Sequence, residues 1–213
     1  MGTDYAAQLK AEIGTWCIPD EHDRREKITR ERIRHHKLVR DLKLDQLPTN
    51  LMDIAEVGGG PFPVSDLIEF RTRTVYDPCT DDYRKYFPCP DHDSQMIEQV
   101  SGAPCFSLVI ATNSLDHVQD PWRAVSAMDE ILVSGGYLAI MCAENNALTN
   151  PHPCHEHNLT AEQIHRWLDA DYETVWQLTY AKDGYRYGWV PFEEKRGQPA
   201  FAMLLRKCTG YKK

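Results

Sequence analysis

From residue 53 onward the chain alternates short apolar runs with stretches of helical spacing. The runs at 53–57, 74–77, 106–111 and 137–143 are rich in Val, Ile, Leu and Ala and have the length of buried strands. Strands that alternate with helices form a mainly parallel sheet with helices on both faces. The last part of the chain differs, because 173–181 and 199–207 resemble two longer strands joined by a segment too long for a tight hairpin. We therefore predict an α/β fold whose sheet ends in an antiparallel strand pair.

Two helices within this region carry recognisable start signals. Asp120-Pro121 places an N-cap before a proline at the first helical position, and Gly135-Gly136 ends that element. The predicted buried stripe of this helix is Trp122, Val125, Met128 and Leu132. Thr160 and Gln163 form a capping box for a second helix, which buries Ile164, Trp167 and Leu168.

The first 48 residues predict two further helices. Tyr5, Leu9, Ile13 and Trp16 recur at helical spacing, and Ile28, Ile33, Leu38 and Leu42 mark a second, less regular face before Pro48. These helices hold too few apolar residues to form a core of their own. We expect residues 1–48 to be a helical lid or flank on a main domain formed by residues 49–213.

Composition is typical of one soluble domain. The chain has 213 residues, of which 42% are hydrophobic, and no apolar run approaches the roughly 20 residues that span a bilayer. The first residues lack a secretory signal, so we expect a cytoplasmic protein with no membrane partner. Seven cysteines are scattered without a C-x-x-C pair, which indicates reduced thiols rather than a disulfide frame or a zinc knuckle.

The net charge of −8 argues against nucleic acid as a partner, because phosphate binding needs a basic surface. The charge is uneven, since residues 24–43 hold nine Lys and Arg against three acidic residues. This stretch is either a solvated helix face with i,i+4 pairs such as Glu26 with Arg30, or a basic arm for a phosphorylated or nucleic-acid substrate.

A glycine-dense turn follows the first predicted strand. In Glu56-Val57-Gly58-Gly59-Gly60-Pro61-Phe62 an acid stands at the junction, and Asp77 closes the next apolar run. A strand, a glycine turn, a helix and a second strand ending in an acid form the half-unit that binds a nucleoside in doubly wound folds. The glycines allow close approach of the backbone to a ligand, and Asp77 is placed to accept hydrogen bonds from ribose hydroxyls.

Over residues 53 to 207 these motifs together resemble the class I S-adenosylmethionine-dependent methyltransferases of the small-molecule type. The resemblance implies a Rossmann-like, doubly wound, mostly parallel sheet with S-adenosylmethionine as cofactor. It implies that Glu56, Gly58, Gly59 and Gly60 face the methionine moiety, Asp77 the ribose and Glu98 the adenine pocket. Residues 106–118, with Asn113 and Leu115, match the fourth-strand motif that borders the transferred methyl group. The chain departs from the family at Phe62, where a third glycine is usual, and at Ser107, where an aspartate is usual.

Histidines provide the candidate catalytic residues. His117 follows the fourth strand, on the side where cofactor and substrate meet in such sheets, and could act as a base. His157 belongs to the segment 152–157, which holds three histidines, Cys154 and Glu156. That segment could be a substrate loop, a solvated loop or a metal site. We expect a substrate loop and no bound metal, because its prolines hinder convergence on one ion.

The function predicted from these residues is methyl transfer from S-adenosylmethionine to oxygen or nitrogen of a polar small molecule. One alternative is an RNA or nucleotide-linked methyltransferase that uses the basic arm. The other is a relative that binds the cofactor without catalysis. The sequence indicates neither the acceptor nor the oligomeric state.

Overall fold

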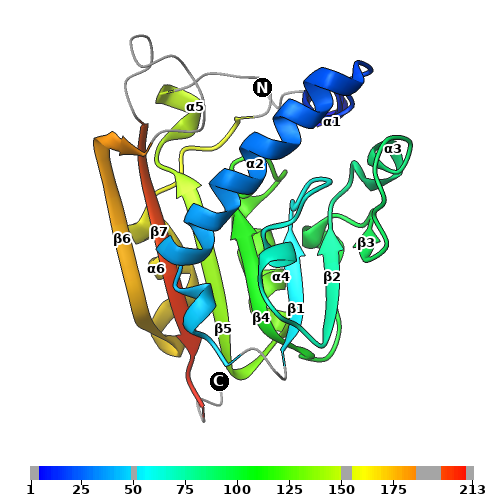
Figure 1. Ribbon diagram of the computed structural model, residues 1–213. Helices are drawn as coiled ribbons and strands as arrows, with labels where there is room; N and C mark the ends of the chain where they lie inside the picture. The colour runs from blue at the N-terminus through cyan, green and yellow to red at the C-terminus, as the bar shows by residue number, and fades with distance from the viewer. Residues whose placement is uncertain (1–4, 49–51, 150–154, 186–197, 210–213) are drawn as a thin grey trace.

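The protein is described by a computed structural model that covers residues 5–48, 52–149, 155–185 and 198–209. Within these ranges, seven strands form one sheet in the order β3-β2-β1-β4-β5-β7-β6 (Figure 1). The parallel strands are β1 (Asp53–Val57), β2 (Thr72–Tyr76), β3 (His92–Asp93), β4 (Phe106–Thr112) and β5 (Leu132–Ala143). The last two, β6 (Tyr172–Tyr185) and β7 (Gln198–Lys207), are antiparallel. The predicted fold class is therefore confirmed.

Helices cover both faces of the sheet. The α-helices are α1 (Tyr5–Trp16), α2 (Glu21–Asp41), α3 (Thr80–Tyr83), α4 (Pro121–Ile131), α5 (Asn146–Thr149) and α6 (Ala161–Leu168). Short 3-10 helices are η1 (Leu44–Gln46), η2 (Val64–Leu67), η3 (Ile97–Gln99) and η4 (Asp169–Asp171). None of the helices in the described ranges has both the length and the apolar character needed to cross a membrane.

The predicted helix starts are present as specific hydrogen bonds. The Asp120 side chain accepts from the Arg123 amide at 3.0 Å. Thr160 and Gln163 form the reciprocal capping box, with side-chain to backbone distances of 2.8 and 3.2 Å. These contacts lie within four residues along the chain, which is why local sequence identifies them.

Alternate residues along the central strands bury two separate cores. Val109 of β4 and Ile140 of β5 pack with Met128 of α4 and Ile164 of α6. On the opposite face, residues from β1, β4 and β5 pack with the end of α2, which crosses the sheet diagonally in Figure 1. This second core contains Leu38, Val39, Leu42, Leu44, Ile54, Leu108, Ile110, Ala139 and Met141.

The helix expected between the first two strands is absent: residues 58–71, all of them described, contain only η2. Pro61 and Pro63 lack the backbone N–H that a helix needs beyond its first turn, so they interrupt one here. Helix α2, from before the sheet, contributes to the core on this face of β1 instead. Phe62, at the family's glycine position, packs against Trp16 and Phe87.

The helix predicted to run to Gly135 ends earlier, at Ile131. Pairing of Leu132 with Phe106 on β4 starts β5 there, and Gly136 lies inside the strand, where an added Cβ would come 3.0 Å from the Ser107 carbonyl oxygen. Trp122, predicted in the buried stripe, is 53% exposed, because the buried face is set by Ala124, Val125, Met128 and Ile131.

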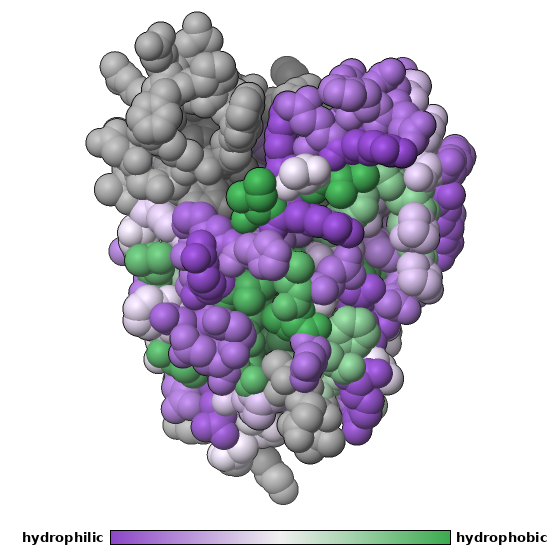
Figure 2. All heavy atoms as spheres, viewed as in Figure 1, coloured by the Kyte–Doolittle hydropathy of each residue, from purple (hydrophilic) through white to green (hydrophobic). Residues whose placement is uncertain are grey.

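The basic segment 24–43 lies almost entirely in α2, where acidic residues pair with many of its cations. Glu26 pairs with Arg30, as predicted, and Glu21 with Arg25, Glu31 with Arg34 and Asp41 with Lys37. Hydrophilic residues dominate the surface over α1 and α2 in Figure 2. These pairs support the interpretation of a solvated helix face.

Candidate functional site

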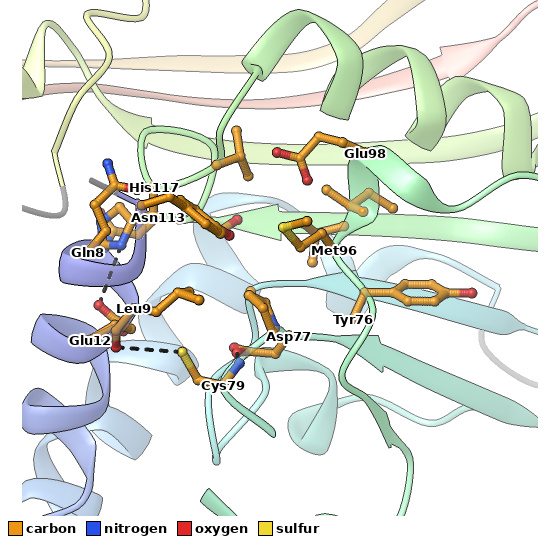
Figure 3. Close-up of a pocket in the computed structure, with 17 residues that line it drawn as sticks. Gln8, Leu9, Glu12, Tyr76, Asp77, Cys79, Met96, Glu98, Asn113 and His117 are labelled. Atoms are coloured by element: carbon orange, nitrogen blue, oxygen red, sulfur yellow. Dashed lines mark hydrogen bonds and ion pairs between the residues drawn. The ribbon is translucent and has the colours of Figure 1, made fainter. Parts of the chain in front are cut away.

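A cavity lies at the carboxyl ends of β1, β2 and β4. The ends of the strands contribute Val57, Gly58, Tyr76, Asp77, Asn113 and Ser114 to its wall. Helix α1 forms the opposite wall, with Gln8, Leu9 and Glu12 facing Asp77, Asn113 and His117 in Figure 3. Because β2 and β4 lie on either side of β1, the cavity is at the topological switch point where doubly wound sheets bind ligands.

Gly58 makes the closest approach between two strand ends. Its φ is +64°, and an added Cβ would lie 2.4 Å from the Cβ of Ser114. Its amide donates to the Tyr76 carbonyl at 2.9 Å, which fixes the turn. Only glycine satisfies both the left-handed backbone and the contact with the β4 end. The Ser114 hydroxyl is buried there and has no hydrogen-bond partner among the described residues.

Asp77 directly follows β2 and reaches under the glycine turn. Its two carboxylate oxygens accept from the Gly60 amide at 3.0 Å and the Cys79 amide at 2.9 Å. The side chain is buried, and this burial raises its pKa to about 6, although the two amide donors oppose the shift. Each oxygen retains a second lone pair, so the carboxylate can also accept from a ligand hydroxyl.

Glu56 does not line the cavity and binds backbone amides instead. It lies outside the cavity wall, fully buried, and its oxygens accept from the Val64 amide at 2.7 Å and the Ser65 amide at 2.9 Å. Burial raises the pKa of this carboxyl. Its contacts hold the segment after the glycine turn against β1, so any effect of Glu56 on a ligand would be indirect.

Gly59, Gly60 and Leu115 are likewise absent from the cavity wall. Gly60 supports Asp77 through its amide, and Leu115 is fully buried in the core beside α4. Of the predicted cofactor-binding residues, the wall contains Gly58, Asp77, Glu98 and Asn113.

Glu98 and Asn113 occupy two sides of the cavity. Glu98 lies in η3, and its carboxylate accepts from the Gln119 amide at 2.8 Å, which ties η3 to the loop before α4. Asn113 follows β4 with a φ of +54°, a left-handed conformation that asparagine tolerates better than most residues. The turn after β4 is thereby directed across the end of β1.

An ion pair joins α1 to the end of β4. His117 Nδ1 lies 3.5 Å from Glu12 Oε2. Burial disfavours the charge on His117, but the Asp116 and Glu12 carboxylates outweigh it and raise the pKa of His117 to about 9. Burial also disfavours the charge on Glu12, and the His117 contact outweighs it and lowers the pKa of Glu12 to about 2. His117 is therefore an imidazolium at neutral pH here, and a role as base requires separation from Glu12.

His155 and His157, which follow β5, make different contacts. His157 Nε2 donates to the Val118 carbonyl at 2.7 Å, which anchors its segment to the loop after β4. His155 Nε2 lies 4.0 Å from Asp116 Oδ2, and the His155 ring is 5.1 Å from the His117 ring. Residues 152–154 of the predicted substrate loop lie outside the described ranges.

Sequence reasoning did not find Glu12, Ser114 or Asp116. Glu12 belongs to a helix read only as a cover, and Asp116 was part of a matched motif without a role. The adjacent acid and histidine at 116 and 117 were the available signal. Their joint contact with His155 depends on how the loops after β4 and β5 meet.

The cavity fits the nucleoside part of S-adenosylmethionine. The turn at Gly58 leaves no room for a Cβ, the Ser114 hydroxyl has no partner in the described part of the chain, and Asp77 presents a buried carboxylate. A ribose offers two hydroxyl donors and can lie close to the backbone of the glycine turn, so it complements this set of groups.

Searches against protein-family models and curated protein sequences gave no match. Solved structures do match. The N-methyltransferase NodS from Bradyrhizobium japonicum WM9, in complex with S-adenosyl-l-homocysteine, is 18% identical with a TM-score of 0.64, and the match covers 95% of this chain and 98% of NodS.

Two further structures are similar over most of the chain. The Burkholderia thailandensis 1,6-didemethyltoxoflavin-N1-methyltransferase is 16% identical, with 96% of this chain and 89% of that one covered and a TM-score of 0.62. The [4+2]-cyclase SpnF is 15% identical, with 83% and 80% covered and a TM-score of 0.59. The chain thus has the fold of class I S-adenosylmethionine-dependent methyltransferases, a fold that also occurs in a cyclase.

Proposed function

We propose that this chain is an S-adenosylmethionine-dependent methyltransferase that acts on nitrogen or oxygen of a polar small molecule. The observation that carries the proposal is the placement of Asp77 and Gly58 together in a cavity at the switch point of the sheet. Two of the similar structures, NodS and the 1,6-didemethyltoxoflavin-N1-methyltransferase, are N-methyltransferases that were crystallised with S-adenosylhomocysteine.

Different residues of the cavity wall would contact different parts of the cofactor. Asp77 would accept hydrogen bonds from the ribose hydroxyls, Gly58 and Ser114 would lie along the ligand, and Glu98 would border the adenine. When bound, S-adenosylmethionine supplies a methyl group already activated by its sulfonium. The protein must therefore chiefly orient the acceptor and exclude water.

Helix α1 is the part of residues 1–48 that we propose as the cover. Tyr5, Gln8, Leu9 and Glu12 line the cavity, and Trp16 lies about 3.5 Å from where a Cβ on Gly60 would be. Helix α2, in contrast, is packed into the sheet core. Movement of α1 would separate Glu12 from His117, open the cavity and lower the pKa of His117, which could then accept a proton from an acceptor hydroxyl.

Calorimetry with S-adenosylhomocysteine tests cofactor binding, and release of that product from S-adenosylmethionine tests transfer. We expect saturable binding, followed by turnover with at least one member of a panel of amines and hydroxylated metabolites. No heat and no thermal shift with either ligand at millimolar concentration would refute the proposal. Binding without turnover on any acceptor, including RNA, would favour the non-catalytic alternative.

Affinity for S-adenosylhomocysteine should depend on pH through Asp77. The pKa of about 6 means that the free carboxyl takes up a proton as the pH falls below 6, whereas ribose hydroxyls bind the carboxylate. Binding then has to expel that proton, so Kd should be about tenfold larger at pH 5 than at pH 7.5. Titrations at several pH values measure this. The dependence should be absent in Asp77→Ala, and an equal slope in that variant would assign it to another group.

A further inference from the structure

Asp116, His117 and His155 converge at the edge of the cavity although they come from two separate loops. Asp116 and His117 follow β4, and His155 follows β5. His117 Nε2 is 3.5 Å and His155 Nε2 is 4.0 Å from the same oxygen, Asp116 Oδ2. One ligand atom from each of the three residues lies within 4.8 Å of the other two.

The His117 ring is oriented as a metal-binding imidazole would be. Its Nδ1 faces the Glu12 carboxylate, and its Nε2 is directed into the cluster. That Nε2 is buried and makes no hydrogen bond with any described residue. Metal-bound histidines characteristically use one ring nitrogen for the ion and the other for a carboxylate or carbonyl, which fixes the tautomer and the ring angle.

The buried Asp116 carboxylate faces both histidines through Oδ2. Buried carboxylates in proteins are paired or coordinate a metal, and this arrangement allows Oδ2 to do either. Glu12 adds a second carboxylate on the other side of His117. Binding of a dication would displace the proton from His117 Nε2, and the two neutral imidazoles between two carboxylates would then leave net negative charge to balance the ion.

We propose that Asp116, His117 and His155 bind one divalent transition-metal ion, with Zn²⁺ as the reference case. Two imidazole nitrogens and one carboxylate oxygen are a common protein ligand set for such ions and leave at least one position open. Ligand atoms around Zn²⁺ lie roughly 3.0–3.5 Å apart. The separations of 3.5 and 4.0 Å from Asp116 are close to this range, and the two histidine nitrogens, within 4.8 Å of each other, would move closer together on binding.

The open position lies on the side of the cavity, because His117 belongs both to the cluster and to the cavity wall. An ion there would bind an oxygen or nitrogen of the acceptor and lower the pKa of a bound hydroxyl. This role rests on the proposed methyl transfer, whereas metal binding does not. The expectation of no metal depended on the prolines of 152–157 and on the lack of a second ligand pair at metal-site spacing, so the two partners from the β4 loop were not foreseen.

Titration of tag-free, chelator-treated protein with Zn²⁺ by calorimetry and with Co²⁺ by visible absorption tests the site. We expect one equivalent to bind, with Co²⁺ bands that indicate nitrogen and oxygen ligands. His155→Gln and Asp116→Asn should each weaken Zn²⁺ binding at least tenfold and change the Co²⁺ spectrum. Circular dichroism and thermal melts of the metal-free variants verify that each remains folded. His155 is only partly buried, so His155→Gln is the variant most certain to fold.

A second group, Asp20, His22 and Asp23, provides the matched control, because it is fully exposed on α2 and its N-cap. His22→Ala should leave the stoichiometry, affinity and Co²⁺ spectrum unchanged. The proposal is overturned if the wild type shows no saturable binding, if folded His155→Gln binds as well as wild type, or if His22→Ala removes the ion. Titrations with the metal and with S-adenosylhomocysteine measure binding at the metal site and at the cofactor site separately, so failure of one is distinguished from failure of the other.

Discussion

Replacing Asp77 with alanine should weaken S-adenosylhomocysteine binding by about 1–3 kcal/mol, or roughly 5–150-fold in Kd. The loss follows from removing a buried carboxylate that can accept charge-assisted hydrogen bonds from both ribose hydroxyls. The variant also loses the acceptors of the Gly60 and Cys79 amides, which hold the glycine turn. Calorimetry at pH 7.5, where the Asp77 carboxyl with its pKa of about 6 is ionised, measures the effect.

Asp93→Ala is the matched control for this experiment. Asp93 ends β3, the strand next to β2, but its side chain is exposed and is not part of the cavity wall. The substitution Asp93→Ala removes the same charge as Asp77→Ala at a position away from the ligand. Its Kd for S-adenosylhomocysteine should therefore stay within about twofold of wild type. Equal losses in both variants would show that net charge, and not a ribose contact, controls affinity.

Leu38→Ala should lower the free energy of unfolding by about 2–5 kcal/mol. Leu38 lies in α2, has no exposed surface and packs with Ile54 and Leu108 of the sheet. A cavity at this position removes the contacts of Leu38 with the face of β1 and β4 that α2 covers. Urea denaturation followed by circular dichroism measures the change.

Ile33→Ala in the same helix is the reference substitution. Ile33 is 66% exposed, so its loss should change stability by no more than about 0.5 kcal/mol. If Leu38→Ala were as mild as Ile33→Ala, α2 would be a detachable flank, as the sequence alone suggested for residues 1–48. A large difference between the two would make α2 part of the main domain and restrict the cover to α1.

Much of the fold follows from local sequence: the mainly parallel sheet with its antiparallel pair, several helix starts and the sheet end at which the cavity lies were all predicted. Strand β1 starts and ends where the apolar run does, and the caps at Asp120 and Thr160 are where they were predicted. Gly58 and Asp77 both line the cavity because a parallel sheet brings its carboxyl strand ends together whatever the rest of the chain does. These features depend on neighbours within a few residues or on the topology of the fold.

The tertiary structure decided which side chains meet. Glu56, predicted to face the ligand, accepts hydrogen bonds from the amides of Val64 and Ser65, because a short turn in place of the usual helix leaves these amides in need of an acceptor. Glu12 and His117 are more than a hundred positions apart, and Asp116 and His155 come from different loops. Such contacts depend on the angle at which α1 and the loops pack on the sheet. That angle is set by the summed packing of many side chains, and no local pattern in the sequence encodes it.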